Sequence, residues 1–314
     1  MLDRRVRYFL AIIEHGSLRS ASKALRLSQP TLTKAIHDLE IELGSPLLRR
    51  HGRGVSMTPT GQILHRRASN MALEDRYART EIDASRNRVN EVLRIGAGPV
   101  WACRYLPDAL AAFTRQCPSW YVTLQVGITR TLQDRAVSGD LDICFGSIDD
   151  LRDTHEIDFN YEPLTTFDMG AFVREGHPLL AANDILRLRD MLAYQWLTYQ
   201  NDLDVISRIN NSFREEQLLP PRVSINTSSL LAGFAITSTS DAIFCLPEPM
   251  VPEAARHGLE RLPIRLWTYK AGVWLHQAAQ RKREVHQLLA IVRAQLAACG
   301  IQTEHAGRAT HTAG

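Results

Sequence analysis

Apolar residues in the first 45 positions recur at helical spacing, in three short runs that polar breaks separate. The first run places four apolar residues on one face: Val6, Phe9, Leu10 and Ile13. Gly16 follows as an expected C-cap, which predicts a helix over about residues 3–14. Ser17 is the expected N-cap of a second helix. The narrow apolar face of that helix would consist of Ala21, Ala24 and Leu25.

A third helix is expected after Ser28, which can serve as its N-cap, with Pro30 in the first turn, where proline is tolerated. One face of this helix is apolar at helical spacing: Leu32, Ile36, Leu39 and Leu43. The other face carries short hydrogen-bonding side chains, one cation and no acid: Pro30, Thr33, Lys34 and His37. Two short helices with a tight break and such a face fit a helix-turn-helix.

A basic segment, RRHGRGV (residues 49–55), follows and predicts a β-hairpin with Gly52 and Gly54 in a tight turn. With the returning strand VSMT it would form a wing beside the third helix. Residues 1–67 carry 12 Lys and Arg against 5 Asp and Glu, whereas the remaining residues carry 25 against 29. A basic module on a slightly acidic body indicates a polyanion partner for the module alone, which is DNA in this context. The alternative is a three-helix core with a solvated basic loop.

A long linker helix is expected next. Thr58 and Pro59 form an N-cap and N1 pair, and a polar, helix-favouring run continues to about residue 88. Six positions with 4-3-4-3-4 spacing form a seam along it: Leu64, Ala68, Met71, Asp75, Ala78 and Ile82. Because nothing in the first domain is large enough to cover this helix, we expect a second copy of the chain to do so in a homodimer. The alternative is a solvated spacer helix.

From residue 90 onward, short apolar strands alternate with helical segments. Helices are expected over about residues 100–116, 129–139, 184–191, 202–217, 228–238 and 280–298, and strands such as VLRIGAG, LDICFGS and DAIFCLP lie between them. This alternation predicts a mostly parallel α/β sheet with helices on both faces. Residues 302–314 are small and polar, and we expect them to be disordered.

The segment from Ala21 to Gly61 also resembles the N-terminal winged helix-turn-helix of LysR-type transcriptional regulators. The resemblance rests on a long match without gaps: Ala21, Leu25, Ser28, Gln29, Pro30, Leu32, Ile36, Leu39, Glu40, Leu43, Gly44, Pro46, Leu47, Arg50, Thr58 and Gly61. Three positions within this segment depart from the family pattern: Ser22 replaces alanine, Thr33 replaces serine and Leu48 replaces phenylalanine.

This resemblance implies a set of DNA contacts. Five residues at the start of the third helix would enter the major groove: Gln29, Pro30, Thr31, Thr33 and Lys34. Gln29 can pair with adenine, and the proline ring or threonine methyls can touch a thymine methyl. Ser28 can bond to phosphate, and Arg50 and Arg53 on the wing would meet phosphate or the minor groove. The resemblance also implies a dimer through the linker helix.

The body resembles the two-lobed effector domain of the same family, which is similar to periplasmic solute-binding proteins. The resulting organisation is a winged helix-turn-helix domain over residues 1–58, a linker and dimerisation helix over 59–89, and an effector-binding domain over 90–301. Lobe I would comprise about residues 90–161 and 268–301, and lobe II about residues 162–267. Ser240 and Asp241 stand where the family has a glycine-rich turn.

Ligands in such lobes bind at the carboxyl ends of strands, near helix N-termini. The loops GPVW (98–101), GITR (127–130) and NTSS (226–229) qualify, and the resemblance implies that they surround the cleft between the lobes. The candidate effector-binding residues are Val100, Trp101, Thr129, Thr227 and Ser228. Hydroxyls and helix N-termini favour an anion, so a small carboxylate is the expected effector. The alternative for each hydroxyl is a helix cap.

The sequence lacks the G-x-S-x-G, Walker A, H-E-x-x-H and G-x-G-x-x-G motifs of several enzyme classes. We therefore expect no catalytic residues, no cofactor and no metal, with a solute-binding protein and a DNA-associated enzyme left as alternatives for the α/β body. Five cysteines without C-x-x-C spacing, no membrane-spanning run and no signal peptide predict a cytoplasmic protein. The expected partners are double-stranded promoter or operator DNA, a small-molecule effector and further copies of the chain, in a homodimer or homotetramer. RNA polymerase is a further candidate.

Overall fold

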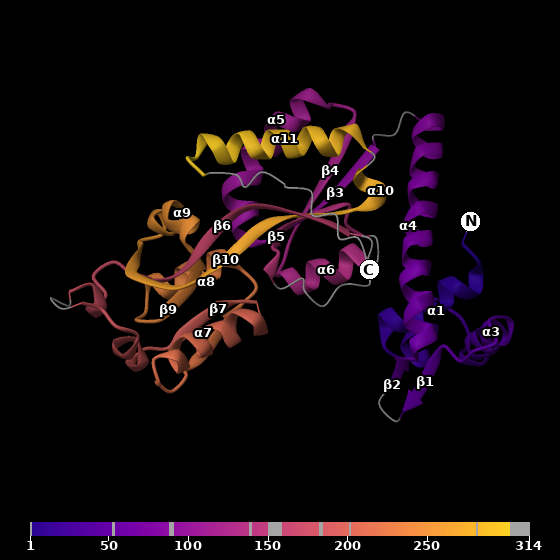
Figure 1. Ribbon diagram of the computed structural model, residues 1–314, viewed down its shortest axis with the longest axis horizontal. Coiled ribbons are helices and arrows are strands. Elements are labelled where there is room, and N and C mark those ends of the chain that lie inside the picture. The colour runs from indigo at the N-terminus through magenta and orange to yellow at the C-terminus, as the bar shows by residue number, and fades with distance from the viewer. Residues whose placement is uncertain are drawn as a thin grey trace, which may run out of the picture. The chain divides into compact units, whose positions relative to one another are not determined.

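The computed structural model describes residues 2–51, 54–87, 91–137, 140–149, 159–181, 185–200, 202–280 and 282–301. The chain divides into two compact units, residues 1–92 with 134–141 and residues 93–133 with 142–314 (Figure 1). Within the described residues, no helix is long and apolar enough to cross a membrane.

The first unit begins with three short helices and a hairpin. The helices are α1 (Arg4–His15), α2 (Leu18–Ala24) and α3 (Gln29–Glu42), and β1 (Leu48–His51) pairs antiparallel with β2 (Gly54–Met57). A long helix, α4 (Pro59–Asn87), follows. Local chemistry sets the ends as expected: Gly16 caps α1 at φ 68°, and the side chains of Ser17 and Ser28 cap α2 and α3.

The three helices enclose a small core of eight buried residues: Phe9, Ile12, Leu18, Ala21, Leu32, Ile36, Leu39 and Leu47. Two expectations for this core were wrong. Leu43 is 45% exposed, because it is the C-cap that follows the last turn of α3. Ala24 is exposed while Ser22 is buried, because the seven-residue α2 buries Leu18 and the residues three and four positions later.

Side chains tie the hairpin to the helices on both sides of it. Glu40 Oε1 accepts hydrogen bonds from the backbone N–H groups of Leu47 at 2.8 Å and Leu48 at 3.2 Å. Thr58 Oγ1 donates to the carbonyl of Pro46 at 2.6 Å and accepts from the N–H of Gly61 at 2.9 Å, so it caps α4 and holds the hairpin at once. These bonds fix where the wing stands relative to α3.

The second unit is built on one eight-stranded sheet with the order β4-β3-β5-β10-β6-β9-β7-β8. Its strands are β3 (Glu91–Ala97), β4 (Trp120–Val126), β5 (Ile143–Ser147), β6 (Phe159–Arg174), β7 (Trp196–Tyr199), β8 (Val223–Thr227), β9 (Ile243–Pro247) and β10 (Leu259–His276). β3 with β5, and β7 with β8 and β9, pair in parallel, whereas β10 pairs antiparallel with β5 and β6, and β6 pairs antiparallel with β9. The sheet is therefore mixed, and the prediction of a mostly parallel sheet was wrong, because two long strands run antiparallel through its middle.

Helices cover both faces of this sheet. α5 (Leu106–Gln116) and α11 (Arg283–Ala298) lie side by side along one face in Figure 1. The unit also contains the first part of α6 (Thr129–Val137) and the whole of α7 (Leu203–Glu215), α8 (Leu230–Ser238), α9 (Val251–Arg256) and α10 (Gln277–Gln280). Alternate residues of β9 belong to two separate cores: Phe244 lies in the larger core with α8, and Ile243 and Cys245 lie in the smaller core with α7.

Two helix predictions in the body need correction. The segment that follows Val100 starts as a π-helix, η1 (Trp101–Tyr105), before α5, because Pro107 has no N–H to bond four residues back. Around residues 184–191 the structure has a 3₁₀-helix, η4 (Leu188–Ala193), and residues 182–184 lie outside the described part. Short 3₁₀ turns also occur as η3 (Pro178–Leu180) and η5 (Glu248–Met250).

Candidate functional site

The first candidate site is the N-terminal turn of α3. Ser28 Oγ accepts from the N–H of Thr31 at 3.2 Å and lies 2.7 Å from the Thr31 hydroxyl, which orders the turn. Side chains of the first turn point to solvent, while the apolar face of the same helix is buried. The exposed residues are Ser28, Gln29, Pro30, Thr31 and Lys34, and Thr33 is half-buried beside them. The structure thus brings together the six residues predicted here for DNA contact.

The wing is the second part of this site. Arg50 lies in β1 opposite Val55 of β2, and its side chain is not among those described. Arg53 lies outside the described residues. Gly54 has φ 149°, and a Cβ there would meet the carbonyl oxygen of Gly16 at 2.6 Å, so the glycine is needed for close approach to the α1–α2 turn. Val55 donates its N–H to the same carbonyl at 3.2 Å, which anchors the wing on the helices.

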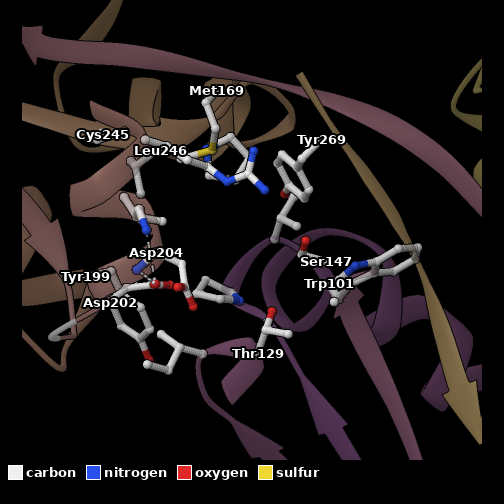
Figure 2. A pocket seen from close by; sticks show the side chains of 18 of the residues that line it. Trp101, Thr129, Ser147, Met169, Tyr199, Asp202, Asp204, Cys245, Leu246 and Tyr269 are labelled. Atoms are coloured by element: carbon white, nitrogen blue, oxygen red, sulfur yellow. Dashed lines mark hydrogen bonds between the residues drawn. The ribbon is translucent and has the colours of Figure 1, made fainter. Parts of the chain in front are cut away.

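The second unit contains a cavity of about 110 Å³ (Figure 2). It lies between the carboxyl ends of β3, β4 and β5 and those of β7 and β9. A volume of this order suits a molecule near the size of benzene. Its lining comes from the loops after β3 and β4, from the carboxyl ends of β5, β7 and β9, from the N-terminal part of α7, and from β6 and β10: Gly98, Pro99, Val100, Trp101, Gly127, Ile128, Thr129, Gly146, Ser147, Met169, Tyr199, Asp202, Asp204, Val205, Arg208, Cys245, Leu246, Pro247, Trp267 and Tyr269.

Three of the five predicted effector-binding residues line this cavity: Val100, Trp101 and Thr129. Thr227 and Ser228 do not. Thr227 Oγ1 accepts from the N–H of Ser229 at 3.1 Å, and Ser229 is the N-cap of α8, so Thr227 orders the turn that starts this helix. Ser228 is exposed in that turn.

Trp101 is held rigidly at the cavity wall. Its ring is fully buried, and its centroid lies 5.5 Å from that of Tyr105, 5.4 Å from that of Phe145 and 5.9 Å from that of Phe167. The indole nitrogen has no hydrogen-bond partner within the described residues. Gly146 of the lining leaves no room for a side chain, since a Cβ there would come within 2.7 Å of the Trp274 ring.

Charged side chains gather on the α7 side of the cavity. Asp202 caps α7, and its Oδ1 accepts from the N–H groups of Asp204 and Val205, each at 3.1 Å. Asp204 accepts from Nη2 of Arg130, in the first turn of α6, at 3.1 Å, so this ion pair joins the two halves of the unit. Arg208, one turn further along α7, adds a cation to the lining. The charges of these four side chains balance.

Neutral polar groups complete the cavity. Burial raises the pKa of the Tyr199 phenol and outweighs the hydrogen bond that the Gln200 amide nitrogen donates to its oxygen at 3.3 Å, which lowers the pKa, so Tyr199 keeps its proton at neutral pH. Burial also raises the pKa of the Cys245 thiol well above its usual range. Cys245 is therefore an apolar wall and not a thiolate nucleophile. Among the described residues, no group of three or more His, Cys, Asp and Glu could hold a metal ion.

Sequence reasoning missed much of the α7 side. Tyr199 ends the strand WLTYQ, and Asp202 follows it, so the rule that ligands bind at carboxyl ends of strands could have found both. Ser147 ends β5 in the same way. Met169, Trp267 and Tyr269 lie inside β6 and β10, and no local signal marks them.

The comparisons with known proteins match both domains of the chain. The profile described as a bacterial regulatory helix-turn-helix protein, lysR family, matches residues 4–62, and the LysR substrate binding domain matches residues 86–297. The chain belongs to the LysR family of transcriptional regulators. As a LysR-family chain it carries a DNA-binding helix-turn-helix and an α/β substrate-binding domain, which confirms the fold expected from the sequence.

Curated relatives of this LysR-family chain align over most of its length. The SDS degradation transcriptional activation protein of a Pseudomonas species is 30% identical over 256 residues, which is 81% of this chain and 82% of the relative. PcaQ of Agrobacterium fabrum is 29% identical over 84% of this chain and 86% of its own length.

Solved structures show the same fold at lower sequence identity. Full-length BenM covers 96% of this chain and 99% of its own, with a TM-score of 0.55 and 19% identity. Full-length OxyR from Pseudomonas aeruginosa covers 96% of this chain and 97% of its own, with a TM-score of 0.58 and 17% identity.

Proposed function

We propose that this LysR regulator reads a specific operator through the first turn of α3 and responds to a small carboxylate in the cavity of its substrate-binding domain. The observation that carries the DNA part is the exposed turn of α3, because it presents amide, hydroxyl and ammonium groups without a carboxylate. Such groups bond to base edges and phosphates in the major groove.

In this proposal, different residues contact the bases and the backbone of the DNA. The bases are contacted by Gln29, Thr31 and Thr33, and the Pro30 ring packs on a thymine methyl. Ser28, Lys34 and the wing residues Arg50 and Arg53 contact the backbone, which supplies affinity that depends on salt. A homodimer through α4 would place two such heads on a palindromic site, and further association of dimers would give a tetramer. A regulator of this kind works on chromosomal DNA in the cytoplasm, where RNA polymerase is a candidate contact.

The cavity supports the effector part of the proposal. Thr129 is the first residue of α6, where helix N–H groups lack intrahelical partners and the helix dipole favours negative charge. Val100 and Trp101 supply apolar surface next to it. A small carboxylate bound there would contact loops from both halves of the unit, so its binding free energy can shift their arrangement and, through it, affinity for the operator.

The test is a binding measurement on the purified full chain. A random DNA pool is selected on the protein, and affinity for the enriched sequence is measured by fluorescence anisotropy with and without a panel of metabolic carboxylates. At least one acid should change operator affinity in the wild type. Thr129→Val should weaken that response about tenfold or more, because the hydroxyl that meets the anion is lost.

Thr227→Val serves as the matched control. The same substitution at a threonine outside the cavity should keep the response, provided thermal unfolding shows an intact fold. An equal loss in both variants would move the effector toward the turn at Thr227 and Ser228. No response from any acid would contradict the carboxylate effector.

A further inference from the structure

The two walls of the cavity differ in hydrogen-bonding character. In Figure 2, Trp101, Thr129 and Ser147 lie on one side and Tyr199, Asp202 and Asp204 on the other. The first wall offers an indole N–H and two hydroxyls, which can donate to an anion or a carbonyl. The second wall holds two carboxylates, which only accept, together with the Tyr199 hydroxyl and the Arg208 guanidinium, which can donate. A ligand that spans the cavity meets an indole N–H and two hydroxyls at one end and the two carboxylate acceptors at the other.

The donor end includes a group without a protein partner. Trp101 is fully buried, and its Nε1, which lies on the cavity side of the ring in Figure 2, has no hydrogen-bond partner within the described residues. A buried N–H without an acceptor destabilises the fold. Trp196 also has a buried Nε1 atom without a partner in the described part of the chain, but it does not line the cavity. Of these two tryptophans, Trp101 alone can be satisfied by a molecule in the cavity.

The aromatic packing around Trp101 fixes the direction of this N–H before any ligand arrives. Tyr105, Phe145 and Phe167 surround the ring, and the π-helical turn η1 carries its backbone. A donor held in place loses little entropy when an acceptor binds. The group is therefore suited to recognise one oxygen atom of the ligand, and not only to supply apolar surface.

The acceptor end is equally well placed. Asp202 and Asp204 lie at the start of α7, held by backbone N–H groups and by Arg130. Arg130 and Arg208 balance their charges, so this end of the cavity carries no net charge. Each carboxylate has about four acceptor sites and can take a further N–H or O–H from a ligand.

We propose that the effector is a small acid of mixed polarity, an amino acid or a hydroxy acid. Its carboxylate oxygen takes the Trp101 indole N–H together with the hydroxyls of Thr129 and Ser147, and its ammonium or hydroxyl group donates to Asp202 and Asp204. This inference rests on the proposed function of the cavity as the effector site. It adds which chemical groups the effector carries and at which wall each one binds.

Matched compounds test this directly. Unbranched carboxylic acids of two to seven carbons are titrated into the full chain by calorimetry in three series: the plain acid, the acid with one hydroxyl group and the acid with one amino group. At least one substituted acid should bind about tenfold or more tightly than the plain acid of the same length. The series that binds best distinguishes an ammonium from a hydroxyl group.

Two pairs of variants assign the ends. Asp204→Asn should weaken the substituted acid about tenfold or more, whereas Asp108→Asn, the same change at an exposed acid in the first turn of α5 outside the cavity, should not. Trp101→Phe keeps an aromatic ring and removes the N–H, so it should weaken plain and substituted acids alike. Trp196→Phe makes the same change in a buried tryptophan away from the cavity and should leave binding intact.

The outcomes separate this inference from the function on which it rests. If plain acids bind as tightly as their substituted partners, the mixed-polarity effector is wrong and the carboxylate effector stands. If Asp204→Asn weakens binding no more than Asp108→Asn does, Asp204 is not a ligand acceptor, which also overturns the inference. If no compound in any series binds, the carboxylate effector fails as well.

Discussion

One residue in each unit makes contacts from which its effect on stability can be predicted, Gly61 in the first unit and His177 in the second. Gly61, in the first turn of α4, leaves no room for a side chain, because a Cβ there would come within 2.1 Å of the Leu47 carbonyl oxygen. His177 is fully buried: its Nδ1 accepts from the N–H of Leu179 at 3.1 Å, and its Nε2 lies 3.3 Å from the Asp241 carbonyl oxygen. The surroundings of Gly61 predict the effect of a substitution on stability, and those of His177 predict how stability depends on pH.

Gly61→Ala should destabilise the winged-helix unit by about 1–3 kcal/mol, because the added methyl must displace the backbone of Leu47. The sign is informative, since alanine in place of glycine in a helix ordinarily stabilises by about 0.5–1 kcal/mol. Urea unfolding followed by circular dichroism measures the change. A gain in stability would show that α4 and the hairpin do not approach as described.

The pH dependence of stability should follow His177. Burial lowers the pKa of its imidazole, so the unfolded chain binds a proton at a higher pH than the folded chain. Stability should therefore be constant above the unfolded value of about 6.5 and fall as the pH drops below it. His177→Asn keeps an acceptor for Leu179 and a donor for Asp241 but does not titrate, so it should flatten that fall.

Urea midpoints at several pH values between 8 and 5 give the comparison. His286→Asn, at an exposed histidine, shows how much of the change any histidine replacement causes. A wild-type stability that rises as the pH falls would contradict a buried, neutral His177.

At the scale of elements, α4 is the helix whose role the single chain explains least. Ala68 is buried, and Leu64 packs on the core that α1, α2 and α3 enclose. The start of the helix is therefore covered by residues of its own unit. Further along the predicted seam, Met71 is 57% exposed and Ile82 is 50% exposed. Apolar side chains at seam spacing and half in water favour cover by a partner helix.

Met71→Glu combined with Ile82→Glu should give a smaller species in analytical ultracentrifugation, because two charges per chain would be buried in the proposed interface. Ile63→Glu, an equally exposed apolar position one residue off the seam, is the matched control and should keep the mass. A double variant with the wild-type mass would show that α4 is a spacer and that copies of the chain associate elsewhere.

At the scale of the whole molecule, local chemistry was predictable and long-range pairing was not. Caps such as Gly16, Ser17 and Ser28 depend on residues within a few positions, and the sequence predicts them correctly. The two long strands β6 and β10 pass through both proposed lobes, so the expected lobe boundaries at residues 161 and 268 fall inside strands. Their antiparallel pairing joins residues about 100 positions apart, which no local pattern reveals.

The same distinction explains the cavity. Thr129 and Val100 stand at strand ends, where a general rule places ligands, and they were found. Met169 and Trp267 reach the cavity only because β6 and β10 cross there in register. Asp204 pairs with Arg130, which lies 74 positions earlier in the chain. Because only folding brings the two residues together, no local pattern marks Asp204.

The central claim is that the first turn of α3 reads DNA sequence, and competition binding of Gln29→Ala tests it most directly. Affinity for the selected operator and for random DNA is measured at two salt concentrations, with Gln62→Ala, at an exposed glutamine of α4, as the control. Gln29→Ala should lose about 1–3 kcal/mol at the operator and little on random DNA, with an unchanged salt slope. Equal losses on both DNAs, or none on either, would contradict base reading by this turn.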